Sequence, residues 1–134
     1  MEYTTVTNMK VRDYECDIQG VVNNSVYQQY LEHARHEFLL DAGINFAELA
    51  KQSINLVVVR VELDYKQALR PGDAFWVGTR IERHSKIRFD FVQGIYREGD
   101  NTLMLEGRVR GAAVNERGRP FLPESLLSLL GGKS

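Results

Sequence analysis

One stretch of the chain has the periodicity of a long helix, and four stretches after it have the periodicity of strands. Between Ser25 and Ala42, apolar residues recur every three or four positions and form one stripe along a helix. The stripe consists of Tyr27, Leu31, Ala34, Phe38 and Ala42. Asn24 precedes it as the expected N-cap, and Gly43 follows it as a helix-ending glycine. A single amphipathic helix has to bury its stripe on a sheet, so the sequence predicts an α+β domain in which one sheet wraps around one helix.

The strand candidates follow the helix in close succession. They cover residues 54–65, 74–83, 87–97 and 102–115, and residues 3–12 form a further strand at the start of the chain. Consecutive strands that are joined by short turns are expected to pair antiparallel. From Val57 to Tyr65, the odd-numbered residues form an apolar face, and the charged residues between them, from Arg60 onward, form the opposite face.

Small residues and caps define the remaining elements. Gly107, Gly111 and Ala113 share one face of the last long strand, which lets a helix approach it closely. Asn45 is expected to cap a short helical turn, and Pro123 to begin a short helix near the end of the chain.

Length and composition exclude several classes of protein. The 134 residues suit one domain with one core, spanning residues 1–134. Lys and Arg number 17 against 18 for Asp and Glu, and the net charge of −1 excludes the strongly basic balance of dedicated duplex binders. No apolar run approaches the roughly 18 residues of a membrane span, and the start lacks the apolar core of a secretory signal. Cys16 is the sole cysteine, which favours a reducing compartment. We therefore expect a soluble, cytoplasmic protein with no nucleic-acid or membrane partner.

Asp17 lies in a polar, glycine-containing loop, seven residues before the expected helix cap. Loops on rigid scaffolds often carry function. A carboxylate here can act as a nucleophile or general base towards a carbonyl held at the helix N-terminus, with the amides of Asn24 and Ser25 as oxyanion donors. Alternatively, Asp17 caps a turn of the loop. The residues alone leave both roles open.

Other reactive side chains match known catalytic patterns poorly. His33 and His36 lie three positions apart, but the residue four positions after His36 is Leu40, so the zincin metal motif is incomplete. A polar outer helix face is the favoured interpretation, and neither a metal nor a cofactor is expected. The Cys16 thiol has no histidine in its loop, which disfavours a thiolate nucleophile.

The turn between the second and third of the four strands is basic. His84, Ser85 and Lys86 form its tip, and Arg83 and Arg88 flank it. Such a tip can bind a nucleotide phosphate or a helix of a carrier protein. A solvated hairpin tip is the competing interpretation.

Several segments together carry a resemblance to a known family. The most specific is the loop and helix start Asp13-Tyr-Glu-Cys-Asp17-Ile-Gln-Gly20-Val-Val-Asn23-Asn24-Ser-Val-Tyr27. Weaker ones follow at Val58-Val59-Arg60 and at Leu69-Arg70-Pro71-Gly72-Asp73. In these segments the chain resembles the hotdog-fold thioesterases of the 4-hydroxybenzoyl-CoA thioesterase type. Within that group it looks most similar to the small single-hotdog acyl-ACP thioesterases of plant plastids and their bacterial relatives.

The resemblance implies a hotdog fold, in which an antiparallel sheet of five or six strands wraps around the long helix. It also implies homo-oligomers, with subunits paired into dimers and usually tetramers, and active sites at the dimer interface. By resemblance, Asp17 is the catalytic carboxylate, and the backbone amide of Asn24 polarises the thioester carbonyl. Relatives that use a glutamate of the helix instead would point to Glu32 or Glu37. Many relatives carry an aromatic residue or a histidine in place of Asn23, so the acyl pocket is expected to differ here.

The residues and the resemblance together give a set of expected substrate-binding residues. They are Asn23, Ser25, Tyr27, Val59, Arg60, His84, Ser85 and Lys86. Leu31, Phe38 and the strand segment 54–59 fit either the acyl pocket or the core.

The expected function is hydrolysis of an acyl thioester, releasing a free carboxylic acid from acyl-ACP or acyl-CoA without a cofactor. A thioester expels a thiolate whose conjugate acid has a pKa of about 8.5, so no strong general acid is needed. One alternative is an aromatic acyl-CoA thioesterase of the hydroxybenzoyl- or dihydroxynaphthoyl-CoA type. Others are a non-catalytic acyl-binding module, in which Asp17 caps a turn, and a structural oligomer.

Overall fold

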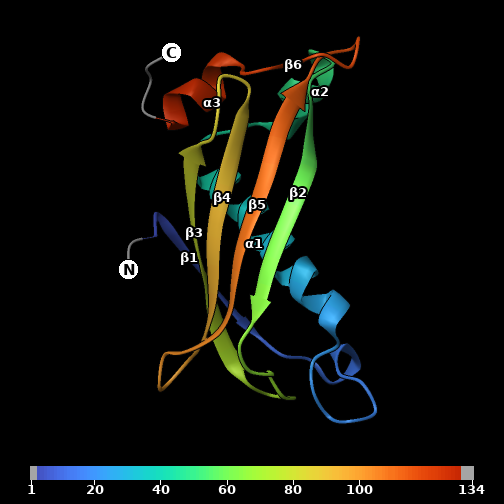
Figure 1. Cartoon of the computed structure of the whole chain (residues 1–134), viewed down its shortest axis with the longest axis vertical. Helices are drawn as coiled ribbons and strands as arrows, with labels where there is room; N and C mark the ends of the chain where they lie inside the picture. The colour runs from blue at the N-terminus through green and yellow to red at the C-terminus, as the bar shows by residue number, and fades with distance from the viewer. Residues whose placement is uncertain (1–2, 131–134) are drawn as a thin grey trace.

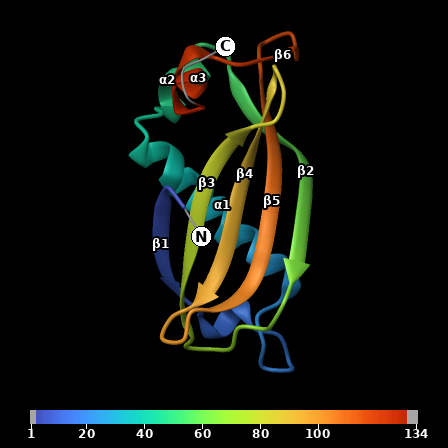
Figure 2. The ribbon, with the colours of Figure 1, turned by 60° about the vertical axis from the view of Figure 1, so that its left-hand side comes forward.

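An antiparallel sheet curves around the long helix α1 (Figures 1 and 2). The structure is a computed structural model and describes residues 3–130. Its strands are β1 (Thr5–Lys10), β2 (Asn55–Tyr65), β3 (Ala74–Arg83), β4 (Arg88–Arg97), β5 (Thr102–Val114) and β6 (Pro120–Phe121). Its helices are α1 (Asn24–Asp41), α2 (Phe46–Lys51) and α3 (Glu124–Leu129), with a 3-10 turn η1 (Asp13–Glu15). This arrangement confirms the predicted α+β architecture.

The order of strands in the sheet departs from their order in the chain. Along the sheet the order is β1-β3-β4-β5-β2, with the short β6 beside β5, and all these pairs are antiparallel. The prediction that consecutive strands pair is correct for β3, β4 and β5 and wrong for β2 and β3. The segment after β2 packs against the start of α1 instead, because the buried Leu69 donates its amide to the Tyr27 hydroxyl and accepts the Val22 amide. β2 therefore lies at an edge of the sheet.

A β-bulge in β2 changes which side chains share a face. The pairing with β5 shifts between Val58 and Arg60. Paired residues point to the same side of a sheet, and the β5 partners of Val58 and Val61 are two positions apart, so both valines point to the inner side. Val57 consequently points to the outer side. The predicted single apolar face from Val57 to Tyr65 is therefore wrong upstream of the bulge.

α1 begins one residue earlier than predicted and is capped by a different asparagine. The side chain of Asn23 accepts hydrogen bonds from the backbone amide and the hydroxyl of Ser25, each at 3.1 Å. Asn23 is thus the N-cap, and Asn24 is the first helical residue. Gly43 follows the end of the helix with a φ of +85°, as predicted for a helix-ending glycine.

The buried face of α1 packs on the inner side of the sheet. It comprises Tyr27, Tyr30, Leu31, Ala34, Phe38 and Leu39, whereas Ala42 is exposed. A Cβ on Gly107 would lie 3.3 Å from the side chain of Leu31, so this glycine allows the close approach predicted for β5. Gly111 instead accommodates Phe89, whose ring would lie 2.7 Å from an added Cβ.

The two ends of the sheet carry different features (Figure 1). The loop that precedes α1 lies at one end, beside the C-terminal end of β2. The turn between β3 and β4 lies at the other end, together with α2 and α3. Asn45 caps α2 as predicted, since its side chain accepts the Glu48 amide at 3.1 Å, and α3 follows Pro123 as predicted.

Candidate active site

A hollow of about 410 Å³ lies at the N-terminus of α1. The loop before the helix, the first turn of α1 and the end of β2 with the residues after it form its walls. Its lining includes Asp17, Asn23, Asn24, Tyr27, Tyr65, Lys66, Gln67 and Ala68. The structure thus brings together four of the residues predicted for the site: Asp17, Asn23, Asn24 and Tyr27.

The loop that carries Asp17 is held by its own backbone. The Asp17 amide donates to the Val21 carbonyl at 2.9 Å, and the Gly20 amide donates to the Asp17 carbonyl at 3.0 Å. Gly20 has a φ of +77°, which favours glycine at this tight turn. Oδ1 of Asp17 accepts the Gln19 amide at 2.9 Å, so this carboxylate does cap a turn. Its other oxygen has no hydrogen-bond partner among residues 3–130, and the side chain is exposed.

The two amides expected as oxyanion donors differ in their availability. The Ser25 amide already donates to the Asn23 side chain. The Asn24 amide, one of the first-turn amides that a helix leaves unpaired, makes no hydrogen bond within the described part of the chain. It also lies at the positive end of the α1 dipole. The Asn24 amide is therefore the donor that this geometry leaves open to a carbonyl oxygen.

Tyr27 and Tyr65 form an aromatic wall of the hollow. Their ring centroids lie 5.5 Å apart with the planes at 72°. The hydroxyl of Tyr65 lies 3.4 Å from the Asn24 carbonyl oxygen and donates to it. Burial raises the pKa of Tyr27, and its hydroxyl accepts the Leu69 amide at 2.9 Å. Tyr27 therefore keeps its hydroxyl proton, and its ring forms part of the wall of the hollow.

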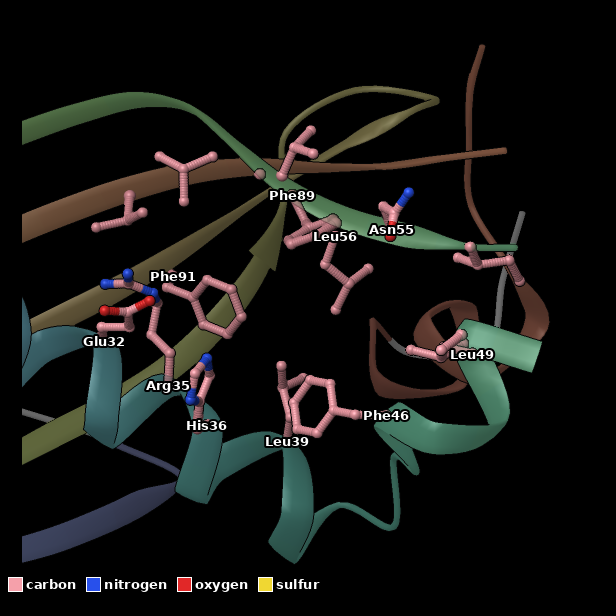
Figure 3. A pocket seen from close by; sticks show the side chains of 16 residues that line it. Glu32, Arg35, His36, Leu39, Phe46, Leu49, Asn55, Leu56, Phe89 and Phe91 are labelled. Carbon is pink, nitrogen blue, oxygen red and sulfur yellow. The ribbon is translucent and has the colours of Figure 1, made fainter. Parts of the chain in front are cut away.

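A second, mostly apolar cavity of about 290 Å³ lies farther along α1 (Figure 3). Side chains of α1, α2, β2, β4 and β5 line it, among them Leu39, Phe46, Leu49, Leu56, Phe89 and Phe91. Glu32, Arg35 and His36 form a polar patch on its α1 side (Figure 3). Nη1 of Arg35 donates to Oε1 of Gln93 at 3.2 Å, and burial lowers the pKa of Arg35. The cavity is suited to an apolar group that enters past polar side chains.

A family model for the thioesterase-like superfamily matches residues 11–130 of the chain. The match includes the loop of Asp17, α1 and the four long strands after it. The chain belongs to the thioesterase-like superfamily. This finding confirms the family resemblance seen in the sequence.

Three known proteins illustrate the relationship to this thioesterase-like chain. An acyl-acyl carrier protein thioesterase of Arabidopsis thaliana (ATL3, chloroplastic) is 38% identical over 121 residues, which are 90% of this chain and 64% of that protein. A hypothetical protein from Thermus thermophilus has a TM-score of 0.84 at 34% identity, covering 96% of this chain and 95% of that one. A 1,4-dihydroxy-2-naphthoyl-CoA thioesterase from Synechocystis has a TM-score of 0.87 at 19% identity, covering 94% of each chain. The predicted hotdog fold is thereby confirmed, and the chain spans just under two thirds of the length of the Arabidopsis relative.

Ser25, in the first turn of α1, follows Asn24 but does not itself line the hollow. The other predicted site residues of this thioesterase-like chain lie away from it. Val59 and Arg60 are exposed in the middle of β2, where Arg60 pairs with Glu62 at 2.8 Å. His84, Ser85 and Lys86 form the exposed β3–β4 turn at the opposite end of the sheet from Asp17 (Figure 1). One copy of the chain therefore does not bring these residues to Asp17.

Other predictions for the thioesterase-like chain concern the helix and the acyl pocket. Leu31 and Phe38 are core residues and do not line the apolar cavity, whereas residues 54–58 do line it. The polar patch of this cavity was not predicted from the sequence. The apolar residues of α2 and β2 that line the cavity could have indicated an apolar site. Glu32 is eight residues from Asn24, or roughly 12 Å along the helix axis.

The two histidines of α1 in this thioesterase-like chain lie in different surroundings. His33 is exposed, and His36 packs edge-on against Phe46 with ring centroids 5.5 Å apart. Within residues 3–130, no three His, Cys, Asp or Glu side chains are grouped so that they could hold a metal ion. No helix in the same range is long and apolar enough to span a bilayer.

Proposed function

We propose that this chain hydrolyses acyl thioesters, converting the thioester and water into a free carboxylic acid and a thiol. Asp17 is the reacting carboxylate. It either attacks the carbonyl carbon to give a mixed anhydride that water then cleaves, or removes a proton from the attacking water. The Asn24 amide binds the carbonyl oxygen as negative charge develops on it. The thiolate leaves without a strong acid because its conjugate acid has a pKa of about 8.5.

One observation carries the proposal. Asp17, an exposed carboxylate with an unengaged oxygen, and Asn24, whose helix N-terminal amide is unpaired, line the same hollow in a chain of the thioesterase-like superfamily. A carboxylate and a carbonyl-polarising amide are the two groups that this reaction needs.

The proposed substrates are acyl groups carried on ACP or on CoA, and the released product is a fatty acid. The Arabidopsis relative named for acyl-ACP supports the carrier-protein form. The apolar cavity supports an aliphatic or aromatic acyl group of limited size, because its walls are apolar over most of their extent. We also propose a cytoplasmic location, in which the free thiol of Cys16 stays reduced.

A second copy of the chain is part of the proposed active form. β2 has only β5 as a strand neighbour in the described sheet, and Val57, Val58, Val59 and Val61 are 38–53% exposed there. Antiparallel pairing of two β2 edges would place the Tyr65 end of one copy beside the Asn55 end of the other. The hollow of one copy would then adjoin the apolar cavity and the basic β3–β4 turn of the other. Dimers of this kind, paired further into tetramers, match the expectation from the family resemblance.

The test is thiol release from acyl-ACP and acyl-CoA substrates with medium, long and aromatic acyl groups. We expect turnover by the wild type and a loss of at least about a hundredfold in Asp17→Asn. The melting temperature should stay the same, since Asp17 is exposed. Equal turnover by both proteins would refute the role of Asp17 and make Glu32 the next residue to test. Acyl binding without turnover by either protein would favour an acyl-binding module, and a preference for aromatic groups would favour an aromatic acyl-CoA thioesterase.

A further inference from the structure

The loop that carries Asp17 stands on a narrow stem. The chain enters the loop after Glu15 and leaves it at Asn23, whose amide donates to the Glu15 carbonyl at 3.0 Å. Inside this contact, Cys16 and Val22 form an antiparallel bridge. Asp17 and the amide that follows Asn23 therefore extend from the two sides of one stem. Any movement of the stem relative to α1 changes the distance between the two proposed reactive groups.

The side chain of Glu15 ties this stem to α1. Its Oε1 accepts the Tyr30 hydroxyl at 2.7 Å and the Arg12 amide at 2.8 Å. Its Oε2 lies 3.3 Å from Nη1 of Arg12. Tyr30 is buried in the second turn of α1, the helix whose first residue, Asn24, lines the hollow. The Tyr30–Glu15 hydrogen bond thus joins the base of the loop to the body of the helix.

A carboxylate is an unusual choice for this position if packing is its only purpose. Glu15 is 8% exposed, and a buried carboxylate is costly unless hydrogen bonds and a cation satisfy its oxygens. A well-packed apolar side chain often replaces a buried ionic group with little loss of stability. What an apolar side chain does not supply is directional bonding to Tyr30 and Arg12. The carboxylate therefore provides a defined position more than it provides stability.

Glu15 is not placed to react with a substrate itself. It does not line the hollow, and both of its oxygens are engaged. Asp17, two residues later, lines the hollow and has an unengaged oxygen. Burial, followed by the hydrogen bond to Glu15, raises the pKa of Tyr30, so its hydroxyl keeps its proton at neutral pH.

We infer that Glu15 is a positioning residue, whose buried carboxylate fixes Asp17 relative to the Asn24 amide through its bond to Tyr30. This inference rests on the proposed function of Asp17 and Asn24. A small misplacement of reacting groups is enough to cost about a hundredfold in rate. The effect of losing Glu15 should therefore fall on kcat, while substrate binding is largely kept.

The experiment compares kcat, KM and the melting temperature of Glu15→Leu, Glu15→Gln, Tyr30→Phe and the wild type. For Glu15→Leu we expect a loss in kcat of about 30-fold or more, with KM changed by less than about threefold. Glu15→Gln keeps an acceptor oxygen for Tyr30 and should retain more activity than Glu15→Leu. The double variant of Glu15→Leu with Tyr30→Phe should be no slower than Glu15→Leu, because both changes break the same link.

Thr79→Val is the matched control. Thr79 is buried and accepts Nε2 of Gln93 at 3.1 Å, in a network that also reaches the Leu31 carbonyl on α1. This substitution removes a buried hydrogen bond on the inner side of the sheet without touching the stem of the loop. It should lower the melting temperature and leave kcat within about twofold of the wild type.

The outcomes separate this inference from the proposed function. A kcat of Glu15→Leu near that of the wild type, with Asp17→Asn inactive, would overturn the positioning role alone. So would a loss that merely follows the melting temperature, as judged against Thr79→Val. Full activity of Asp17→Asn would overturn the proposed function itself. If Glu15→Leu does not fold, Glu15→Gln and Tyr30→Phe decide the matter: a kcat at the wild-type level in both overturns the inference, and a selective fall in kcat supports it.

Discussion

Arg110 and Asp90 are joined by two hydrogen bonds across neighbouring strands, at 2.8 Å from Nε to Oδ1 and 3.2 Å from Nη2 to Oδ2. Arg108 adds a third bond, of 2.9 Å, to Oδ2 of the same carboxylate. Asp90 is 2% exposed, and burial alone would raise its pKa. The hydrogen bonds from Arg110 and Arg108 outweigh burial and hold the pKa of Asp90 below its ordinary value.

Because of this pairing, the fold is expected to lose stability at acid pH. A carboxyl group with a lower pKa in the folded chain stabilises the fold above its unfolded pKa, and this stabilisation is lost as the pH falls through the folded pKa. We therefore expect the melting temperature to decline below about pH 4. Asp90→Asn should decline less steeply and, at pH 7, melt roughly 5 °C lower than the wild type. Thermal melts between pH 7 and pH 3 measure both effects, and parallel curves for the two proteins would contradict them.

The two asparagines at the start of α1 should differ sharply when each is replaced. Asn23→Ala removes the cap on the Ser25 amide and should cost about 1 kcal/mol of unfolding free energy. Asn24→Ala should cost much less, because the Asn24 side chain makes no hydrogen bond among residues 3–130. It should also keep most of the activity, since the backbone amide is the proposed donor. Denaturant unfolding measures the stability of both variants, and thiol release measures their activity. A larger loss of unfolding free energy in Asn24→Ala than in Asn23→Ala would show that Asn24 is the N-cap, as the sequence predicted.

The ring of Tyr3 covers Gly78 on the outer side of the sheet, where its hydroxyl lies 3.0 Å from that of Tyr96. A Cβ on Gly78 would overlap this ring. Gly78→Ala should therefore lower the free energy of unfolding by about 1–2 kcal/mol. In a Tyr3→Ala background the same substitution should cost almost nothing, because the obstacle is gone. Equal costs in both backgrounds, measured by denaturant unfolding, would show that the glycine serves another purpose.

Phe46 closes part of the apolar cavity from α2 (Figure 3). If the cavity holds the acyl chain, Phe46→Ala should enlarge it and shift the highest kcat/KM to longer chains by about two carbons or more. Phe121→Ala is the control, because Phe121 packs on the same core cluster without lining the cavity. The measurement is thiol release from a series of acyl chain lengths. An unchanged preference in Phe46→Ala would place the acyl chain elsewhere.

Much of the fold was predictable because it depends on local periodicity. The helix stripe and the strand alternation each fix an element without knowledge of its partners. The position of β2 at the sheet edge was not predictable, since it depends on the contact between Leu69 and Tyr27, which are distant in the chain. The choice between Asn23 and Asn24 as the cap was also hidden. It follows from the bond of the Asn23 amide to the Glu15 carbonyl, which belongs to the folded loop.

The candidate site was predictable to the extent that it is local. Asp17 and Asn24 flank one short loop, so their proximity follows from the sequence. The separation of the β3–β4 turn from Asp17 depends on the direction of the strands, which a motif does not record. The engagement of the Ser25 amide depends on which asparagine caps the helix. For these reasons the sequence indicated the proposed reactive pair, but not which of the other predicted residues lie beside it within one copy of the chain.

Tyr27 belongs at once to the wall of the hollow and to the hydrophobic core. A change of this side chain that is meant to reshape the hollow would therefore also remove packing from the centre of the domain. Residues 66–68, on the outer wall of the hollow, are exposed and do not belong to the core. Substitutions along that outer wall, whether engineered or evolved, can therefore change which ligands the hollow binds with the least loss of stability.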